Sequence, residues 1–143
     1  MTFAPGTIGA RLDAVAASMG DTPLLVAGSE RRSATEVAAE VRARAVAAVT
    51  APGDRVALRA AGDIDTLILL LGVAAAGRVA VPLDPREPPE RLEALLTLAD
   101  PALAVCAAPT GDGPWTAWPT PADATSPGAA VQPPSTGTVT PVT

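Results

Sequence analysis

The apolar residues of this chain fall into stretches with helical spacing that alternate with short continuous runs. Helical spacing predicts helices at residues 8–19, from Ser33 to the Pro52 break, at 63–76 and at 88–99. Short apolar runs predict strands at residues 24–27, 55–58, 78–83 and 102–106. From residue 55 onward strands and helices alternate, which is typical of parallel strands joined by right-handed crossovers. We therefore expect a three-layer α/β fold with a small, mainly parallel sheet and flanking helices.

The predicted helix at 63–76 is apolar on every side, and such a helix needs cover all round. The cover can come from the neighbouring sheet and helices, from the C-terminal segment, or from another protein. The strand at 102–106 is expected at a sheet edge, where unpaired backbone groups invite association. The interface candidates on these two elements are Leu67, Leu71, Val73 and Val105.

The C-terminal part of the chain differs in composition from the rest. Residues 107–143 are dominated by Pro, Thr, Ala and Gly, carry two charges and show no helical or alternating period. We expect a domain at residues 1–106 followed by a mostly extended tail, with Trp115 and Trp118 the residues most suited to pack back onto the domain.

Composition excludes several classes of site. The chain has no His, Lys or Tyr, and all ten basic residues are Arg. A Ser-His-Asp or Cys-His arrangement and a His-containing zinc site cannot be assembled, so we expect no catalytic residues and no metal. The formal charge of −5 and the scattered arginines argue against nucleic acid as a partner. The single Cys106, the lack of a signal pattern and the lack of a long apolar run indicate a cytoplasmic protein that does not enter the membrane.

The remaining polar candidates have structural explanations. Asp63 and Asp65 stand at a helix start, where capping is a stronger interpretation than a metal or acid–base pair. Asp84-Pro85 is typical of a turn, in which Asp84 and Arg86 can form a local ion pair. Cys106 lies on an apolar strand with no base to activate it, which favours a small buried hydrophobic residue over a nucleophile.

Several segments, in order, resemble one known family. They are residues 52–58 (Pro-Gly-Asp-Arg-Val-Ala-Leu), Gly77, residues 81–86 (Val-Pro-Leu-Asp-Pro-Arg) and residues 89–92 (Pro-Glu-Arg-Leu). Together they resemble the start of the adenylate-forming superfamily, which comprises acyl-CoA synthetases and the adenylation domains of nonribosomal peptide synthetases; residues 81–92 are especially similar to the amino-acid-activating branch. The resemblance implies the fold of the N-terminal subdomain and no site, because the matched residues belong to the scaffold in that family.

The resemblance places the family's first nucleotide-binding loop at residues 134–142, with Ser135, Thr136, Gly137 and Thr138 as the candidate residues. Thr136 and Val139 stand where the family has glycines, and Val142 stands where it has lysine. Glycines let backbone N–H groups approach phosphates, and a β-branched residue obstructs that approach. This stretch is either a degenerate phosphate loop or a chance Thr/Gly/Pro tail.

Two functions from different classes follow. The first is a truncated adenylation domain without catalytic activity that acts by protein–protein interaction, as an accessory or scaffold in a nonribosomal peptide or polyketide system. The second is one part of a split ATP-dependent acyl- or aminoacyl-adenylating ligase that a partner chain completes. For the accessory or scaffold role we expect a protein partner or a homodimer, and no cofactor. We expect ATP and Mg²⁺ only for the split ligase.

Overall fold

A computed structural model describes residues 1–49, 52–108, 110–111 and 113–118 of the chain. Ten helices and strands follow one another in these residues. In chain order they are α1 (Ile8–Met19), β1 (Pro23–Ala27), β2 (Glu30–Ser33), α2 (Ala34–Val49), β3 (Arg55–Arg59), α3 (Ile64–Ala75), β4 (Val79–Leu83), α4 (Pro89–Ala99), β5 (Leu103–Cys106) and β6 (Thr116–Ala117).

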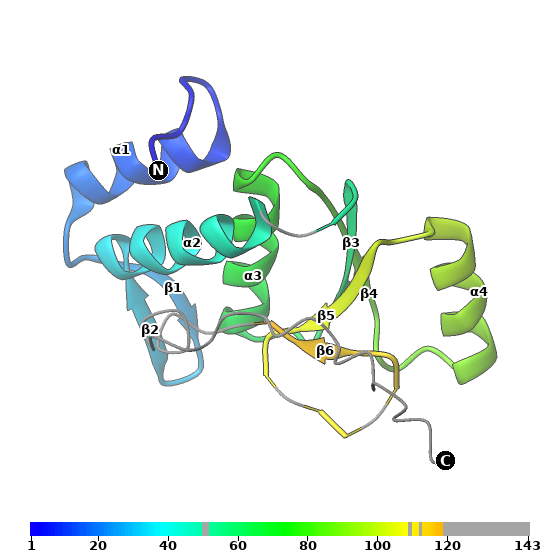
Figure 1. Cartoon of the computed structure of the whole chain (residues 1–143). Coiled ribbons are helices and arrows are strands. Elements are labelled where there is room, and N and C mark those ends of the chain that lie inside the picture. Colours follow the sequence, from blue (N-terminus) through cyan, green and yellow to red (C-terminus); the bar gives the residue numbers. More distant parts are fainter. Residues whose placement is uncertain (50–51, 109, 112, 119–143) are drawn as a thin grey trace, which may run out of the picture.

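The central element is a four-stranded parallel sheet with the strand order β4-β3-β5-β6. Val56 of β3 lies opposite Ala80 of β4 on one side and Leu103 of β5 on the other. Helices α2 and α3 lie to one side of the sheet and α4 to the other (Figure 1). The expected three-layer α/β fold with a small parallel sheet is therefore confirmed.

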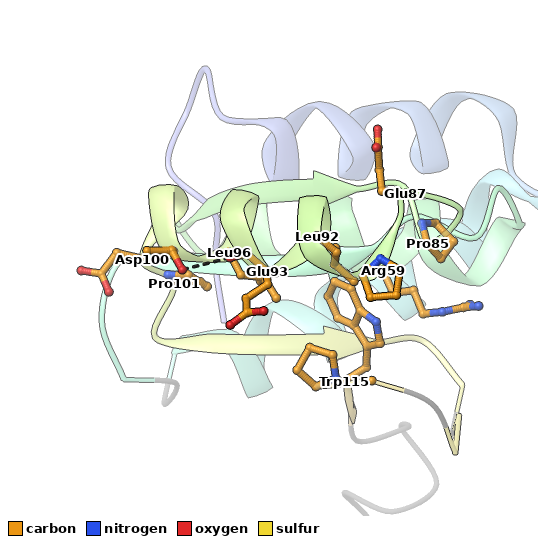
Figure 2. A pocket seen from close by; sticks show the side chains of 13 residues that line it. Arg59, Pro85, Glu87, Leu92, Glu93, Leu96, Asp100, Pro101 and Trp115 are labelled. Atoms are coloured by element: carbon orange, nitrogen blue, oxygen red, sulfur yellow. Dashed lines mark hydrogen bonds between the residues drawn. The ribbon is translucent and has the colours of Figure 1, made fainter.

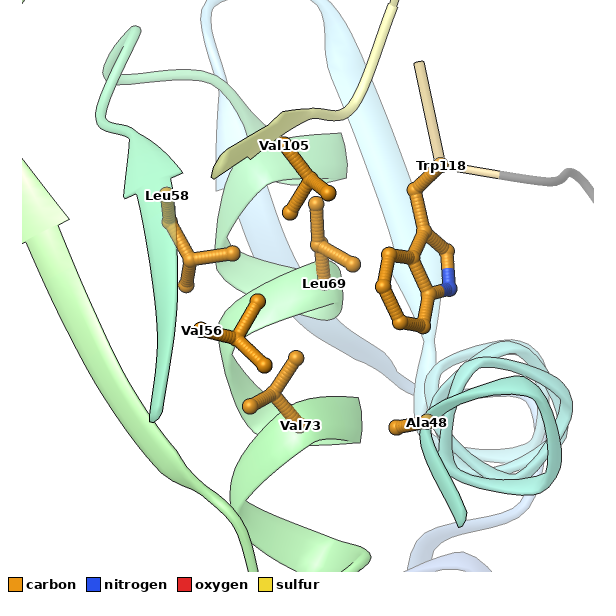
Figure 3. Close-up of a cluster of buried hydrophobic side chains, with 7 residues drawn as sticks. All are labelled: Ala48, Val56, Leu58, Leu69, Val73, Val105 and Trp118. Carbon is orange, nitrogen blue, oxygen red and sulfur yellow. The ribbon is translucent and has the colours of Figure 1, made fainter. Parts of the chain in front are cut away.

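Alternation along β3 and β5 divides the core into two halves. Val56, Leu58 and Val105 point toward α3, where they pack with Leu69 and Val73 (Figure 3). Ala57 and Cys106 belong to the opposite half, which α4 covers with Leu92, Leu95 and Leu96. No residue of α4 is fully buried, so this helix covers its side of the sheet only in part.

The helices α2 and α3 approach each other closely. Val37 and Val41 of α2 pack against Ile64 and Ile68 of α3 in a buried cluster. At Gly72 of α3, a Cβ atom would lie 2.3 Å from the Cβ of Arg44, so no larger residue fits there without moving one helix. This contact supplies much of the cover that the apolar α3 needs.

The capping signals of the sequence are confirmed. Ser33 and Glu36 form a capping box at the start of α2: the Glu36 N–H donates to Ser33 Oγ at 3.1 Å, and the Ser33 N–H donates to Glu36 Oε2 at 2.8 Å. Asp63 caps α3 by accepting the Thr66 N–H at 2.7 Å. These caps set where the two long helices of the core begin.

The sequence interpretation missed the hairpin of β1 and β2, because the second strand, Glu-Arg-Arg-Ser, is polar throughout and has no apolar alternation. Pairing of Ala27 with Glu30 leaves a two-residue loop, in which Gly28 has a φ of 61°. Glycine adopts that conformation without steric cost, which makes Gly28-Ser29 a suitable hairpin turn.

The packed part of the chain continues past residue 106 to Trp118. Strand β6 pairs with Val105 and Cys106 of β5. The tryptophans that flank β6 lie on opposite faces of the sheet: Trp115 packs on the α4 side and Trp118 on the α3 side. Both are at least nine-tenths buried, at 8% and 5% exposure, as expected for residues that pack back onto the domain. Residues 119–143 lie outside the described residues.

The expectation that residues 102–106 form a sheet edge was wrong, because β6 pairs along β5 on that side. Val105 is 2% exposed and Val73 is fully buried, so neither can contact a partner while the core is intact. The physical reason is that Trp118 covers this part of α3 and β5. Leu67, at 40% exposure, and the half-buried Leu71 remain the accessible interface candidates on α3.

Candidate functional site

The carboxyl ends of the parallel strands are the natural place for a site in this fold. The connection from β3 through α3 leads to β4 on one side, and the connection from β4 through α4 returns to β5 on the other side of β3. In open α/β sheets, ligands bind where the strand order reverses in this way. Here that point lies between β3, which ends at Arg59, and β5, which ends at Cys106.

A groove runs along α4 from this point. It encloses about 780 Å³ and is lined by α4, by the ends of β3 and β4 and by residues 113–115. Arg59 and Pro85 lie at one end and Asp100 and Pro101 at the other, while Leu92, Leu96 and Trp115 line the middle (Figure 2). The groove exists because α4 covers the sheet only in part.

Arg59 is the distinctive charge of this region. It is half-buried and makes neither an ion pair nor a side-chain hydrogen bond with the described residues. It also lines a second cavity of about 400 Å³, beside Ala61, Asp84 and Arg86. The sequence interpretation passed over Arg59; its place directly after a predicted parallel strand is the signal that could have marked it.

Asp84 and Arg86 form the predicted local ion pair, 2.7 Å apart between Oδ2 and an arginine nitrogen. The Arg86 backbone N–H also donates to Asp84 Oδ1 at 2.9 Å, which gives the expected turn. Hydrogen bonds from the Arg86 side chain, followed by the one from its backbone, lower the pKa of the Asp84 carboxyl to about 2 from an ordinary value of 3.8. The pair lies at the surface and is satisfied by itself.

Replacement of Arg86 should release the Asp84 carboxyl. In Arg86→Gln we expect the pKa of Asp84 to rise from about 2 toward 3.8, because the hydrogen bonds from the Arg86 guanidinium, the main cause of the lowered pKa, are lost. The pKa of Asp84 is lower in the folded state than in the unfolded state. The ion pair therefore stabilises the folded state at pH values above 3.8, and this stabilisation is lost as the pH falls through about 2. Carboxyl carbon NMR during acid titration measures the midpoint, with Arg91→Gln, which disrupts a separate pair with Glu87, as the control. A wild-type midpoint near the ordinary value would contradict the assignment.

The other acidic candidates are also engaged. Asp63 is the α3 cap, and Asp65 lies 3.7 Å from Arg32, which also contacts Glu30 at 2.9 Å and Glu40 at 3.2 Å. Although partial desolvation opposes it, attraction to these carboxylates raises the pKa of Arg32. Among the residues that the structure describes, no three His, Cys, Asp or Glu side chains gather as a metal site would require. Cys106 is buried against Trp115 and Ala57, in agreement with its interpretation as a small hydrophobic residue.

The phosphate-loop candidates Ser135, Thr136, Gly137 and Thr138, and the whole stretch 134–142, lie outside the described residues. The interface candidates and the groove do not coincide: Leu67 and Leu71 are on α3, whereas the groove lies along α4, on the other side of the sheet. In the described part of the chain, no helix is both long and apolar enough to cross a membrane.

A long-chain-fatty-acid–AMP ligase, FadD32 of Mycolicibacterium smegmatis, is 43% identical to this chain over 79 residues. The match covers 50% of this chain and 12% of that protein, so the chain spans only a small share of this curated relative.

Solved structures share the fold. The N-terminal subdomain of Klebsiella oxytoca NpsA, in complex with 3-hydroxybenzoyl-AMSN, superimposes with a TM-score of 0.64 at 19% identity, over 78% of this chain and 29% of that one. The nonribosomal peptide synthetase FmoA3, in an α-methyl-L-serine-AMP bound form, gives a TM-score of 0.62 at 24% identity, over 69% of this chain and 12% of that one.

These likenesses agree with the motif order and with the parallel sheet described above. The model of the AMP-binding enzyme family matches residues 12–140, which is most of the chain. The chain belongs to the AMP-binding enzyme family, and its described residues have the fold found in the N-terminal subdomain of adenylation domains.

Proposed function

We propose that these 143 residues act by binding and not by catalysis, as a non-catalytic accessory or scaffold within a nonribosomal peptide or polyketide biosynthetic system. The observation that carries the proposal is that a chain of the AMP-binding family contains neither lysine nor histidine. Adenylate formation requires positive charge and close backbone approach at the phosphates of ATP. Residues 134–142 have Thr, Val and Val where the resemblance calls for two glycines and a lysine.

The polar candidates that the sequence singled out are engaged in other contacts. Asp63 caps α3, Asp84 is held by Arg86, and Arg32 is surrounded by carboxylates. No cofactor is therefore part of the proposal for the chain alone, and we derive no step through ATP or Mg²⁺. A protein partner or a second copy is favoured over nucleic acid or a membrane, since the net charge is −5. The proposal includes a cytoplasmic location, because the chain has a single cysteine, Cys106, and therefore no internal disulfide that would require an oxidising compartment.

The second candidate is one part of a split adenylating ligase. It is favoured by the 43% identity to a fatty-acid–AMP ligase and by a family match that extends to residue 140, into the loop region. In that case the partner chain supplies the missing cationic and phosphate-binding groups, and the substrate is an acyl group of the kind named for that relative.

The accessible part of α3 gives the test of the binding role. Leu67 lies on the mostly apolar helix α3, and 40% of its surface is exposed. We expect light scattering of the purified protein to give about twice the 14.2 kDa chain mass, or a pull-down from its native extract to yield a specific complex. Leu67→Glu should abolish the association, because it places a charge in the contact.

Leu98→Glu is the matched control, since Leu98 is 82% exposed on α4, on the other side of the sheet. It should leave the association intact, and circular dichroism should show both variants folded. A monomeric wild type that captures nothing would contradict the binding role. Equal association of the wild type and a folded Leu67→Glu variant would remove α3 as its surface.

A further inference from the structure

The groove along α4 has the composition of a ligand site. Its volume of about 780 Å³ lies within the range of small-molecule pockets. Leu92, Leu96 and Trp115 give it an apolar wall, and Arg59 gives it one cation that no described residue neutralises. In small-molecule sites, a few polar groups within a mostly apolar lining determine the orientation of the ligand.

The charges along the groove are unequally distributed. Glu87 lines the groove near Arg59, but its carboxylate is 2.8 Å from Arg91 and is already paired. The carboxylates of Glu93 and Asp100 lie farther along α4, away from Arg59 (Figure 2). An anion is therefore attracted at the Arg59 end and repelled at the other, which fixes the direction of a bound molecule.

We infer that the groove binds a small amphipathic organic anion, whose charged group meets Arg59 and whose apolar body lies on Trp115, Leu92 and Leu96. A half-buried guanidinium without a partner gains a charge-assisted hydrogen bond from such a ligand. The half-buried Leu92 and Leu96 gain burial of their accessible surface, and the small exposed part of the Trp115 indole offers an aromatic contact. This inference does not depend on the proposed binding role, since it involves α4 and not α3.

The probe is 4-phenylbutanoate, with its neutral amide, 4-phenylbutanamide, as the matched compound. Calorimetric titration of the full chain should give a Kd on the order of 1 mM for the acid, as expected for a ligand of about twelve heavy atoms. The amide should bind roughly tenfold more weakly. Absence of binding by the acid up to several times that concentration, or equal binding of acid and amide, would overturn the inference.

Substitutions test whether Arg59 is the residue that binds the charged group of the ligand. Arg59→Gln should weaken binding of the acid about tenfold, whereas Arg31→Gln should leave it unchanged, because Arg31 is exposed on β2 and does not line the groove. Glu93→Gln should bind the acid as well as or better than the wild type. Loss of binding in Arg31→Gln but not in Arg59→Gln would contradict the assignment.

The two tryptophans locate the ligand independently of affinity. Trp115 lines the groove and Trp118 packs on the opposite face of the sheet, so the chain's two indole N–H signals report on opposite sides. Addition of 4-phenylbutanoate should shift the Trp115 signal and leave the Trp118 signal in place; Trp118→Phe identifies which is which. A shift of Trp118 alone would place the ligand elsewhere and overturn the inference.

Discussion

Replacement of Trp118 by alanine should lower the free energy of unfolding by about 3–5 kcal/mol. Trp118 is 5% exposed and packs with Leu69, Val73 and Val105 between α3 and the edge of the sheet. Its removal leaves a cavity against α3 and also loosens β6, whose two residues are held between Trp115 and Trp118. For a domain of this size the loss corresponds to a melting temperature lower by on the order of 10–20 °C, measurable by calorimetry.

Two control variants separate packing from other effects. Trp118→Phe keeps a ring in place and removes the indole N–H, which is buried and finds no acceptor among the described residues. It should cost much less than the alanine variant, because a buried unsatisfied donor disappears with the lost area. Leu98→Ala, at an 82% exposed position, should change stability by less than about 0.5 kcal/mol. A melting temperature for Trp118→Ala equal to that of the wild type would show that residues 113–118 do not belong to the core.

The sequence was sufficient for the elements that local rules control. Helical spacing, the Ser33–Glu36 box and the Asp63 cap are local signals, and they placed α2 and α3 within one or two residues. Alternation of strands and helices likewise led to the parallel sheet, because crossover handedness limits the possible arrangements.

Contacts between distant residues could not be predicted in the same way. The pairing of β6 with β5 depends on the tertiary packing of Trp115 and Trp118, in a segment without periodicity. Because the sequence did not reveal that pairing, β5 was predicted at a sheet edge with Val105 accessible. The groove along α4 was missed for a related reason: Arg59, Leu92 and Trp115 come from three separate segments.

The absence of adenylating activity is the second large effect that we expect. Adenylate formation depends on preorganised cationic and N–H groups around the reacting phosphates, and such electrostatic groups are usually the largest contribution to catalysis. The chain has no lysine, and the β-branched residues Thr136 and Val139 stand where the resemblance calls for glycines. Binding of a nucleotide or of an acid alone requires none of these groups, and would not indicate activity.

The central claim, that these residues bind without catalysing, is tested most directly by ATP–pyrophosphate exchange with the purified chain. Fatty acids, aryl acids and amino acids serve as substrates, and the fatty-acid–AMP ligase relative serves as the positive control. We predict exchange indistinguishable from a blank without substrate, for every acid, with the chain alone. Exchange that appears only when a second chain from the native extract is added would replace the accessory role by the split ligase. Clear substrate-dependent exchange by the chain alone would contradict the account.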